Sequence, residues 1–117
     1  MDRDAVAAAD FCYLTTRGRR SGRPHEIEIW FAAAGTTFYL LSGGGASADW
    51  VRNLRAEPAV TVRVGDAVWS AAGRVVGDDG EAARARRLVF EKYQPRAGGD
   101  LTRWRDTALP VAIDRQS

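Results

Sequence analysis

Apolar and polar residues alternate along residues 26–31, which is the period of a half-buried β-strand. Short apolar runs predict further strands at residues 11–16, 37–42, 60–64, 68–76 and 109–113. Most of the segments that join these runs are short, and Gly65-Asp66 between two of them is a hairpin turn signal. We therefore expect six strands, mainly joined by hairpins, in an antiparallel arrangement.

The segments between the strands that carry helix signals are residues 2–9, 47–56 and 79–93. Ser47 or Asp49 can cap the second of these helices, and Asp78 or Asp79 can open the third. Residues 94–107 are expected to be irregular or weakly helical. The helices are inserted among the strands and do not alternate with them. This order favours a mainly β (α+β) fold, an antiparallel barrel with peripheral helices, over a doubly wound parallel sheet.

The connection between the first two strands, residues 17–24, is longer than a common hairpin turn and contains four arginines, two glycines, one serine and no acid. Arginine and serine side chains, together with freely folding glycine backbone, bind phosphate and carboxylate groups. We therefore predict an anion-binding loop. His25 follows directly and is expected either to add a donor to the anion or to end the strand at the surface.

A second candidate region follows the third strand, where Gly43, Gly44 and Gly45 allow another backbone or a flat ligand to approach closely. Trp50 and Asn53 lie three positions apart on the next helix and so share a face. An indole beside an amide suits a planar heterocycle with hydrogen-bonding edges. The alternative is structural, with Trp50 anchoring the core and Asn53 satisfying the glycine loop.

Composition limits the class of protein. The 117 residues predict one domain, and the net charge of +2 is smaller than the +4 of the arginine loop alone, so the basic charge is local and disfavours nucleic-acid binding. A single cysteine and a single histidine leave no disulfide and no metal site to predict. With no long apolar stretch and no secretory signal, a cytoplasmic protein without a membrane span is expected.

Residues 14–24, 28–31, 42–45, 49–62 and 109–113, in this order and spacing, resemble the deazaflavin-dependent nitroreductase family. These are split β-barrel proteins related to the pyridoxamine-phosphate oxidases, and the resemblance covers nearly the whole chain. It implies a single six-stranded split-barrel domain, usually dimeric, so a homodimer is expected. It also implies binding of coenzyme F420, a deazaflavin with an acidic tail, with FMN as the alternative cofactor.

The resemblance also assigns the cofactor site residue by residue. Two loop arginines and a serine match the segment that holds the phosphate side, the glycine segment matches the loop beside it, and the following helix faces the cofactor. The expected cofactor-binding residues are Arg19, Arg20, Ser21, Gly22, Pro24, His25, Ile27, Ser42, Gly43, Gly44, Gly45, Trp50 and Asn53. The chain differs from better-known members in having His25 where they carry another basic residue, and Gly43 where they carry a lysine. The second change removes a cation, for which Arg17, Arg23 or a partner chain can compensate.

The reaction that the resemblance implies is hydride transfer from reduced F420 to a small electron-poor acceptor, namely a quinone, an enone or a nitro compound. No side chain is expected to act as a catalytic nucleophile. Tyr93 and Trp104 are candidates for the wall of a substrate pocket, and Tyr93, water or the cofactor for the source of the proton. Two alternatives stay open: an F420-binding carrier with little turnover, and an FMN-dependent oxidoreductase of the same fold.

Overall fold

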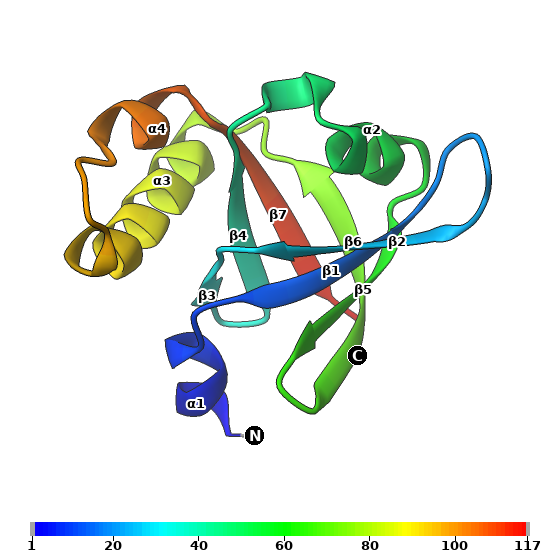
Figure 1. Cartoon of the computed structure of the whole chain (residues 1–117), viewed down its shortest axis with the longest axis horizontal. Coiled ribbons are helices and arrows are strands. Elements are labelled where there is room, and N and C mark those ends of the chain that lie inside the picture. Colours follow the sequence, from blue (N-terminus) through cyan, green and yellow to red (C-terminus); the bar gives the residue numbers. More distant parts are fainter. Residues whose placement is uncertain (1, 117) are drawn as a thin grey trace.

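The computed structural model describes residues 2–116 and shows one curled sheet with helices packed around it (Figure 1). The strands are β1 (Cys12–Arg17), β2 (Pro24–Ile29), β3 (Ala32–Ala34), β4 (Thr37–Ser42), β5 (Ala59–Val64), β6 (Ala67–Val75) and β7 (Leu109–Arg115). The α-helices are α1 (Arg3–Ala8), α2 (Asp49–Ala56), α3 (Asp79–Tyr93) and α4 (Thr102–Thr107), and two 3₁₀ helices are η1 (Gly45–Ser47) and η2 (Gln94–Arg96).

The sheet has the order β2-β1-β5-β6-β7-β4-β3, and every neighbouring pair is antiparallel. Only Trp30 and Phe31 separate β2 from β3, so one stretch of chain lies at both edges of the sheet. This stretch brings the two edges together in a split barrel (Figure 1). The predicted fold class is confirmed, with seven strands where six were expected, because the strand that begins as β2 is interrupted and resumes as β3.

The predicted caps are confirmed for one helix and wrong for another. Asp78 caps α3 as expected, its carboxylate accepting a hydrogen bond of 2.8 Å from the backbone nitrogen of Glu81. In contrast, α2 has Ala48 at its N-cap and no side-chain cap, so neither Ser47 nor Asp49 fills this role. The reason is that η1 ends where α2 begins, which places Ser47 inside η1 and Asp49 in the first turn of α2.

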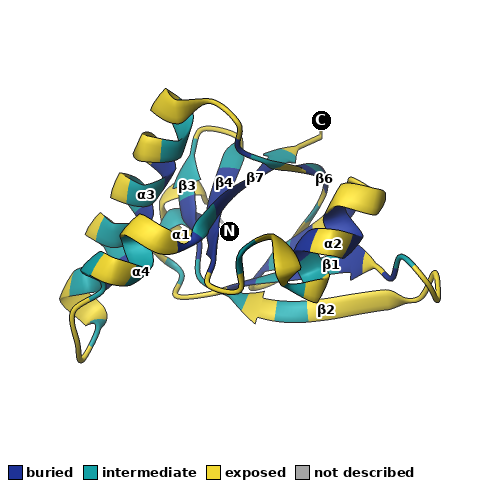
Figure 2. Ribbon diagram, turned by 90° about the horizontal axis from the view of Figure 1, so that it is seen from above, coloured by how far each residue is buried: buried dark blue, intermediate teal, exposed yellow. Residues whose placement is uncertain are grey.

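Two apolar clusters hold the sheet. Strand β4 is buried on both faces because Phe38 and Leu40 point into the barrel, while Tyr39 and Leu41 belong to the cluster that includes residues of α3. Helix α2 covers another part of the barrel and inserts the fully buried Leu54 into its core. Figure 2 shows the buried faces of α2 and of the strands turned towards this core, with the part of β2 next to its loop exposed.

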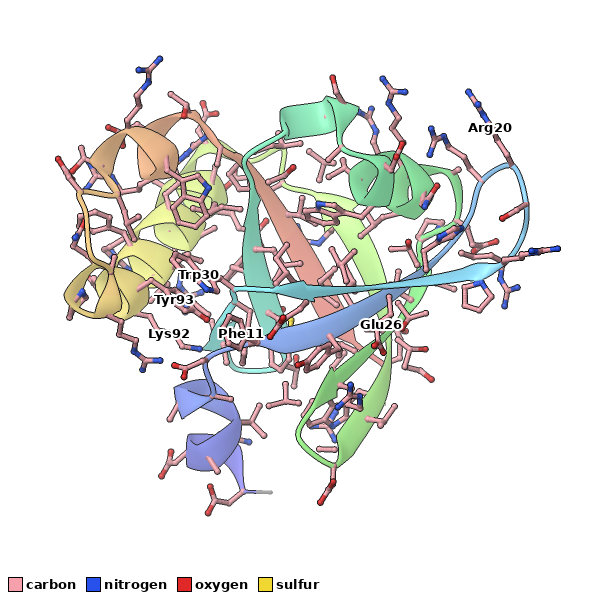
Figure 3. All side chains as sticks on the ribbon, viewed as in Figure 1. Phe11, Arg20, Glu26, Trp30, Lys92 and Tyr93 are labelled. Atoms are coloured by element: carbon pink, nitrogen blue, oxygen red, sulfur yellow. The ribbon has the colours of Figure 1, made fainter. Side chains whose placement is uncertain are left out.

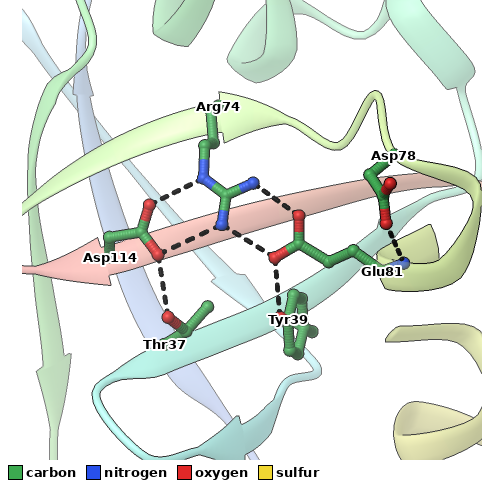
Figure 4. Close-up of polar contacts among 6 residues, drawn as sticks. All are labelled: Thr37, Tyr39, Arg74, Asp78, Glu81 and Asp114. Atoms are coloured by element: carbon green, nitrogen blue, oxygen red, sulfur yellow. Dashed lines mark hydrogen bonds and ion pairs between the residues drawn. The ribbon is translucent and has the colours of Figure 1, made fainter. Parts of the chain in front are cut away.

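A network of charged side chains ties β6, β7 and β4 to α3 (Figure 4). The guanidinium of Arg74 donates to Asp114 at 2.7 Å and to both carboxylate oxygens of Glu81 at 2.7 and 2.8 Å. Tyr39 donates to Glu81 and Thr37 donates to Asp114, each at 2.8 Å. The hydrogen bonds from Arg74 lower the pKa of Glu81 to about 2, and they also lower the pKa of Asp114.

This network predicts an acid-dependent loss of stability. Glu81 and Asp114 bind protons more readily in the unfolded chain, so their stabilising contribution is complete above the unfolded pKa. We expect the free energy of unfolding to decrease as the pH falls from 4.5, the usual pKa of Glu81, towards about 2, its pKa in the folded protein. Urea unfolding followed by tryptophan fluorescence at a series of pH values measures this slope.

The comparison for this pH series is a variant that lacks the Arg74 cation. Arg74→Met is expected to be less stable at pH 7 and to show a shallower loss between pH 4.5 and 2, because both carboxylates lose their main partner. Arg103→Met, at an exposed position of α4, should keep the wild-type profile. An equal slope in wild type and Arg74→Met would show that Arg74 does not hold these pKa values down.

Candidate functional site

The arginine loop is a closed turn between β1 and β2. The backbone nitrogen of Gly18 donates to the carbonyl of Arg23 at 2.7 Å, and that of Gly22 donates to the carbonyl of Gly18 at 2.8 Å. Gly22 has φ of 72°, which a residue with a side chain rarely adopts. The guanidinium of Arg17 donates to the Gly22 carbonyl at 2.8 Å, so this arginine helps to hold the loop.

Two polar side chains of the loop meet above Gly18. A Cβ at Gly18 would lie 2.6 Å from Oγ of Ser21 and 2.7 Å from Nε2 of His25, so both side chains in their present positions require glycine here. Oγ of Ser21 also accepts a hydrogen bond of 3.1 Å from the backbone nitrogen of Arg23. The loop therefore presents a hydroxyl and an imidazole side by side on one surface.

Helix α2 fixes the loop through Asn53, which is 5% exposed. Oδ1 of Asn53 accepts from the backbone nitrogen of Arg19 at 3.1 Å and from its guanidinium at 2.8 Å. The amide nitrogen of Asn53 lies 3.4 Å from Oγ1 of Thr16, to which it donates. Asp49 adds an ion pair of 3.3 Å with Arg19. Asn53 thus makes its hydrogen bonds with the arginine loop. The structural alternative, in which Asn53 bonds to the glycine loop, is wrong.

The two neighbouring arginines have different surroundings. The guanidinium of Arg19 is engaged by Asn53 and Asp49, whereas Arg20 is exposed and has no ion pair within residues 2–116. Figure 3 shows Arg20 extending from the loop, clear of the barrel. Of these two arginines, Arg20 is the cation that is available to a ligand.

An open groove lies between the loop, the start of β2 and the first turns of α2. Its volume of about 620 Å³ is within the range of small-molecule sites, roughly 300–1,000 Å³. The groove is lined by Thr16, Gly18, Arg19, Arg20, Ser21, Pro24, His25, Glu26, Ile27, Asp49, Trp50 and Asn53. Basic, hydroxyl, aromatic and aliphatic side chains therefore meet on one surface, as a ligand with an anionic part and a flat part requires.

Not all of the expected site residues line this groove. Gly22 belongs to the loop but does not line the groove, and neither do Ser42 to Gly45, which run from the end of β4 into η1. Oγ of Ser42 donates to the Gly45 carbonyl at 2.9 Å. A Cβ at Gly43 would lie 3.5 Å from Nε1 of Trp104, so the glycine segment lies beside α4. The structure thus pairs Gly43 with Trp104 and places neither in the groove.

Tyr93 and Trp104 lie in an aromatic cluster with Trp30. Figure 3 shows Tyr93 next to Trp30. The rings of Tyr93 and Trp30 are stacked at 4.3 Å, and Trp104 meets Trp30 edge to face at 5.6 Å. Tyr93 is 2% exposed, and its hydroxyl accepts from the backbone nitrogen of Phe31 at 3.0 Å. Burial raises the pKa of Tyr93 to about 12. Tyr93 therefore has no surface to offer a ligand, whereas Trp104 is partly exposed.

Sequence reasoning missed several residues that line the groove, namely Thr16, Gly18, Glu26 and Asp49. Thr16 and Gly18 flank Arg17, the first arginine of the loop, and this position in the sequence could have identified them as site residues. Asp49 was expected only as a helix cap, because nothing in the sequence shows that a residue 30 positions from Arg19 reaches it.

Other site chemistries have no support in residues 2–116. In this part of the chain, no three histidine, cysteine, aspartate or glutamate side chains are grouped so that they could hold a metal ion. Cys12 is buried, and burial raises the pKa of its thiol to about 12. Among the helices of the described residues, none has the length and apolar character needed to cross a membrane.

The antiparallel sheet, with its two edges joined through β2 and β3, defines a split-barrel protein. More narrowly, the chain belongs to the F420H(2)-dependent quinone reductase family, whose model matches residues 4–116. Membership of this family makes the chain an F420-dependent oxidoreductase.

Solved structures support the fold. A conserved hypothetical protein, Rv2991 from Mycobacterium tuberculosis, matches with a TM-score of 0.80 and 20% identity, covering 100% of this chain and 82% of that chain. An F420-H2 dependent reductase (FDR-A) matches with a TM-score of 0.71 and 22% identity, covering 90% and 93%. Another similar structure, with a TM-score of 0.71 and 23% identity over 97% of this chain and 81% of that chain, is described as a domain-swapped dimer.

Proposed function

We propose that the groove between the arginine loop and α2 binds coenzyme F420, and that the protein reduces a small electron-poor acceptor with it. The acceptor classes are quinones, enones and nitro compounds. The observation that carries the proposal is the exposed Arg20, which has no ion pair within residues 2–116 and lines a groove that Trp50 and Ile27 also line. A cation for the acidic tail and partly exposed apolar side chains for the flat ring thus share one site.

The residues of the groove fit such a ligand. Arg20, Ser21 and the loop backbone offer donors to phosphate and carboxylate oxygens, and Trp50 and Ile27 offer surface to a ring system. The acids that line the groove have partners: Asp49 pairs with Arg19 at 3.3 Å, and Glu26 lies 3.9 Å from Arg63. Neither carboxylate therefore opposes an anionic ligand with its full charge.

The protein's part in the reaction is to bind, orient and shield. When bound, F420 supplies the hydride chemistry. We propose that Arg20 and Ser21 contact the tail, while Arg19 and Asn53 act as positioning residues that hold the loop. Arg17 is bonded to the Gly22 carbonyl, and neither Arg17 nor Arg23 lines the groove, so the structure gives no support to either as a replacement for the missing cation at Gly43. The buried hydroxyl of Tyr93, already bonded to backbone, does not support a role as proton donor.

The homodimer is also a proposal for this chain. Its support is the domain-swapped dimer among the similar structures. The groove is open on one side, so a second copy could cover it. Sedimentation equilibrium with and without F420 measures the oligomeric state directly.

The function is tested with purified protein, F420 and a panel of acceptors. We expect saturable binding of F420 and acceptor-dependent oxidation of the reduced cofactor with at least one quinone, enone or nitroaromatic compound. Tight binding without oxidation by any acceptor would assign the chain to the F420 carriers. A clear preference for FMN in a competitive titration would instead favour the FMN-dependent alternative.

The role of Arg20 predicts a specific loss of affinity. Arg20→Ala should weaken F420 binding by about 1.5–3 kcal/mol, roughly 10–150-fold in Kd, because one charge-assisted hydrogen bond is removed. Fluorescence titration of F420 at low salt measures this change. The matched control is Arg55→Ala, an exposed arginine of α2 that does not line the groove. Unchanged affinity in a folded Arg20→Ala variant would remove Arg20 from the site.

A further inference from the structure

A second, smaller pocket is lined by residues of α1, of β3 and the β3–β4 turn, and of strands β4 to β7. Its volume is about 140 Å³, and none of its lining residues belongs to the groove described above. Phe38, Val62, Trp69 and Ile113 contribute its apolar wall, and Arg3 and Arg115 also line it. The pocket is therefore a separate feature of this chain, distinct from the proposed cofactor site.

The wall of this pocket is suited to a single aromatic ring. Phe38 and Trp69 meet edge to face with their centroids 5.7 Å apart, and Val62 and Ile113 are each 2% exposed. Aromatic rings favour such edge-to-face arrangements with a further ring. An apolar cavity of about 150 Å³ in another protein holds one benzene molecule, so a volume of this size accepts one ring and little more.

The two arginines add charge to this apolar pocket. Both arginines are exposed, while the apolar wall is largely buried. The guanidinium of Arg115 lies 5.0 Å above the ring of Trp69, and its backbone nitrogen donates to the Thr36 carbonyl at 2.9 Å. Within residues 2–116, neither Arg3 nor Arg115 forms an ion pair, and Asp114, which precedes Arg115, bonds to Arg74.

From this combination we infer that the pocket is an accessory binding site for a small carboxylic acid with a single aromatic ring. The ring lies against Trp69 and Phe38, and the carboxylate meets Arg3 and Arg115. Guanidinium groups bind carboxylates through paired, charge-assisted hydrogen bonds, which a neutral ligand of the same shape cannot form. The inference does not depend on F420, because the two sites share no residue.

The test compares three ligands by isothermal titration calorimetry on the full chain without F420. Benzoate carries both the ring and the charge, benzyl alcohol carries the ring alone, and acetate carries the charge alone. We expect benzoate to bind at least tenfold more tightly than benzyl alcohol, the factor that one charge-assisted hydrogen bond supplies. Acetate should show no saturable binding, because it buries no ring.

Variants then locate the binding. The double variant Arg3→Gln/Arg115→Gln should lower the affinity for benzoate to that for benzyl alcohol, and leave benzyl alcohol binding unchanged. Retained benzyl alcohol binding also reports that the variant is folded. Arg103→Gln, an exposed arginine of α4 outside both pockets, is the control and should bind benzoate as wild type does.

Several results would overturn the inference. These are no saturable benzoate binding by wild type, equal affinities for benzoate and benzyl alcohol, or benzoate binding that the double variant keeps and Arg20→Ala loses. The last result would place benzoate in the groove. If the double variant does not fold, the ligand series on wild type and on Arg115→Gln alone decides the question. Because no F420 is present, these results are independent of the proposed function.

Discussion

Gly73→Ala is expected to lower the free energy of unfolding by about 2–3 kcal/mol, the upper part of the range for overpacking a core. Gly73 is a buried residue of β6, at the place where α2 packs on the sheet. A Cβ there would lie 2.5 Å from Cγ of Leu54 and closer still to Cδ1. Leu54 is fully buried, so it cannot move aside without displacing its neighbours.

A double-mutant cycle tests this contact. Leu54→Ala alone should cost about 2–5 kcal/mol, but Gly73→Ala/Leu54→Ala should cost less than the sum, because the new methyl group enters the space that Leu54 leaves. Urea unfolding gives the three values. Gly77→Ala is the matched control, since a Cβ at Gly77 meets nothing within 4 Å. A Gly73→Ala variant as stable as Gly77→Ala would contradict the described packing of α2.

Asn53→Ala should affect both stability and the proposed cofactor site. The substitution removes the acceptor of two hydrogen bonds from Arg19 and the donor to Thr16. The backbone nitrogen of Arg19 then loses its partner, so we expect a loss of about 1–3 kcal/mol in the free energy of unfolding. F420 affinity should fall roughly tenfold or more, because the loop must be ordered again at the moment of binding.

Asn53→Asp tests whether the hydrogen bonds from Arg19 are what holds the arginine loop in place. Its carboxylate still accepts from Arg19, and Thr16 can turn its hydroxyl to donate, so stability should stay within about 1 kcal/mol of wild type. Loop order can be followed without cofactor, through amide hydrogen exchange of residues 18–23. We expect faster exchange in Asn53→Ala and near wild-type exchange in Asn53→Asp. Equal protection in all three proteins would show that Asn53 does not hold the loop.

Much of the fold could be predicted because its signals are local. Alternation predicted the strand over residues 26–31, short apolar runs predicted the others, and Asp78 was one of two candidates for the start of α3. The short strand β3 was missed because Ala32, Ala33 and Ala34 show no alternation and alanine is not typical of strands. The strand forms nonetheless, since β4 offers partners for all three residues. Pairing with β4 thus determines the structure of a segment whose own sequence pattern predicts little.

The candidate site was predictable only where its residues are close in the sequence. The arginine loop and the Trp50–Asn53 spacing were both visible, and the structure brings them to one groove. The different surroundings of Arg19 and Arg20 could not be predicted, because they depend on a hydrogen bond between Arg19 and Asn53, which are 34 positions apart. For the same reason, the separation of Gly43 from the groove and its contact with Trp104 required the structure.

The position of β7 has a consequence for synthesis of the protein. This strand is the last in the described chain but lies inside the sheet, between β6 and β4. Its hydrogen bonds join residues as far apart as Thr37 and Asp114, 77 positions away. A chain emerging from the ribosome therefore cannot close its barrel until residues 109–115 have left the exit tunnel. Until then the edges of β4 and β6 are open to pairing with other nascent chains.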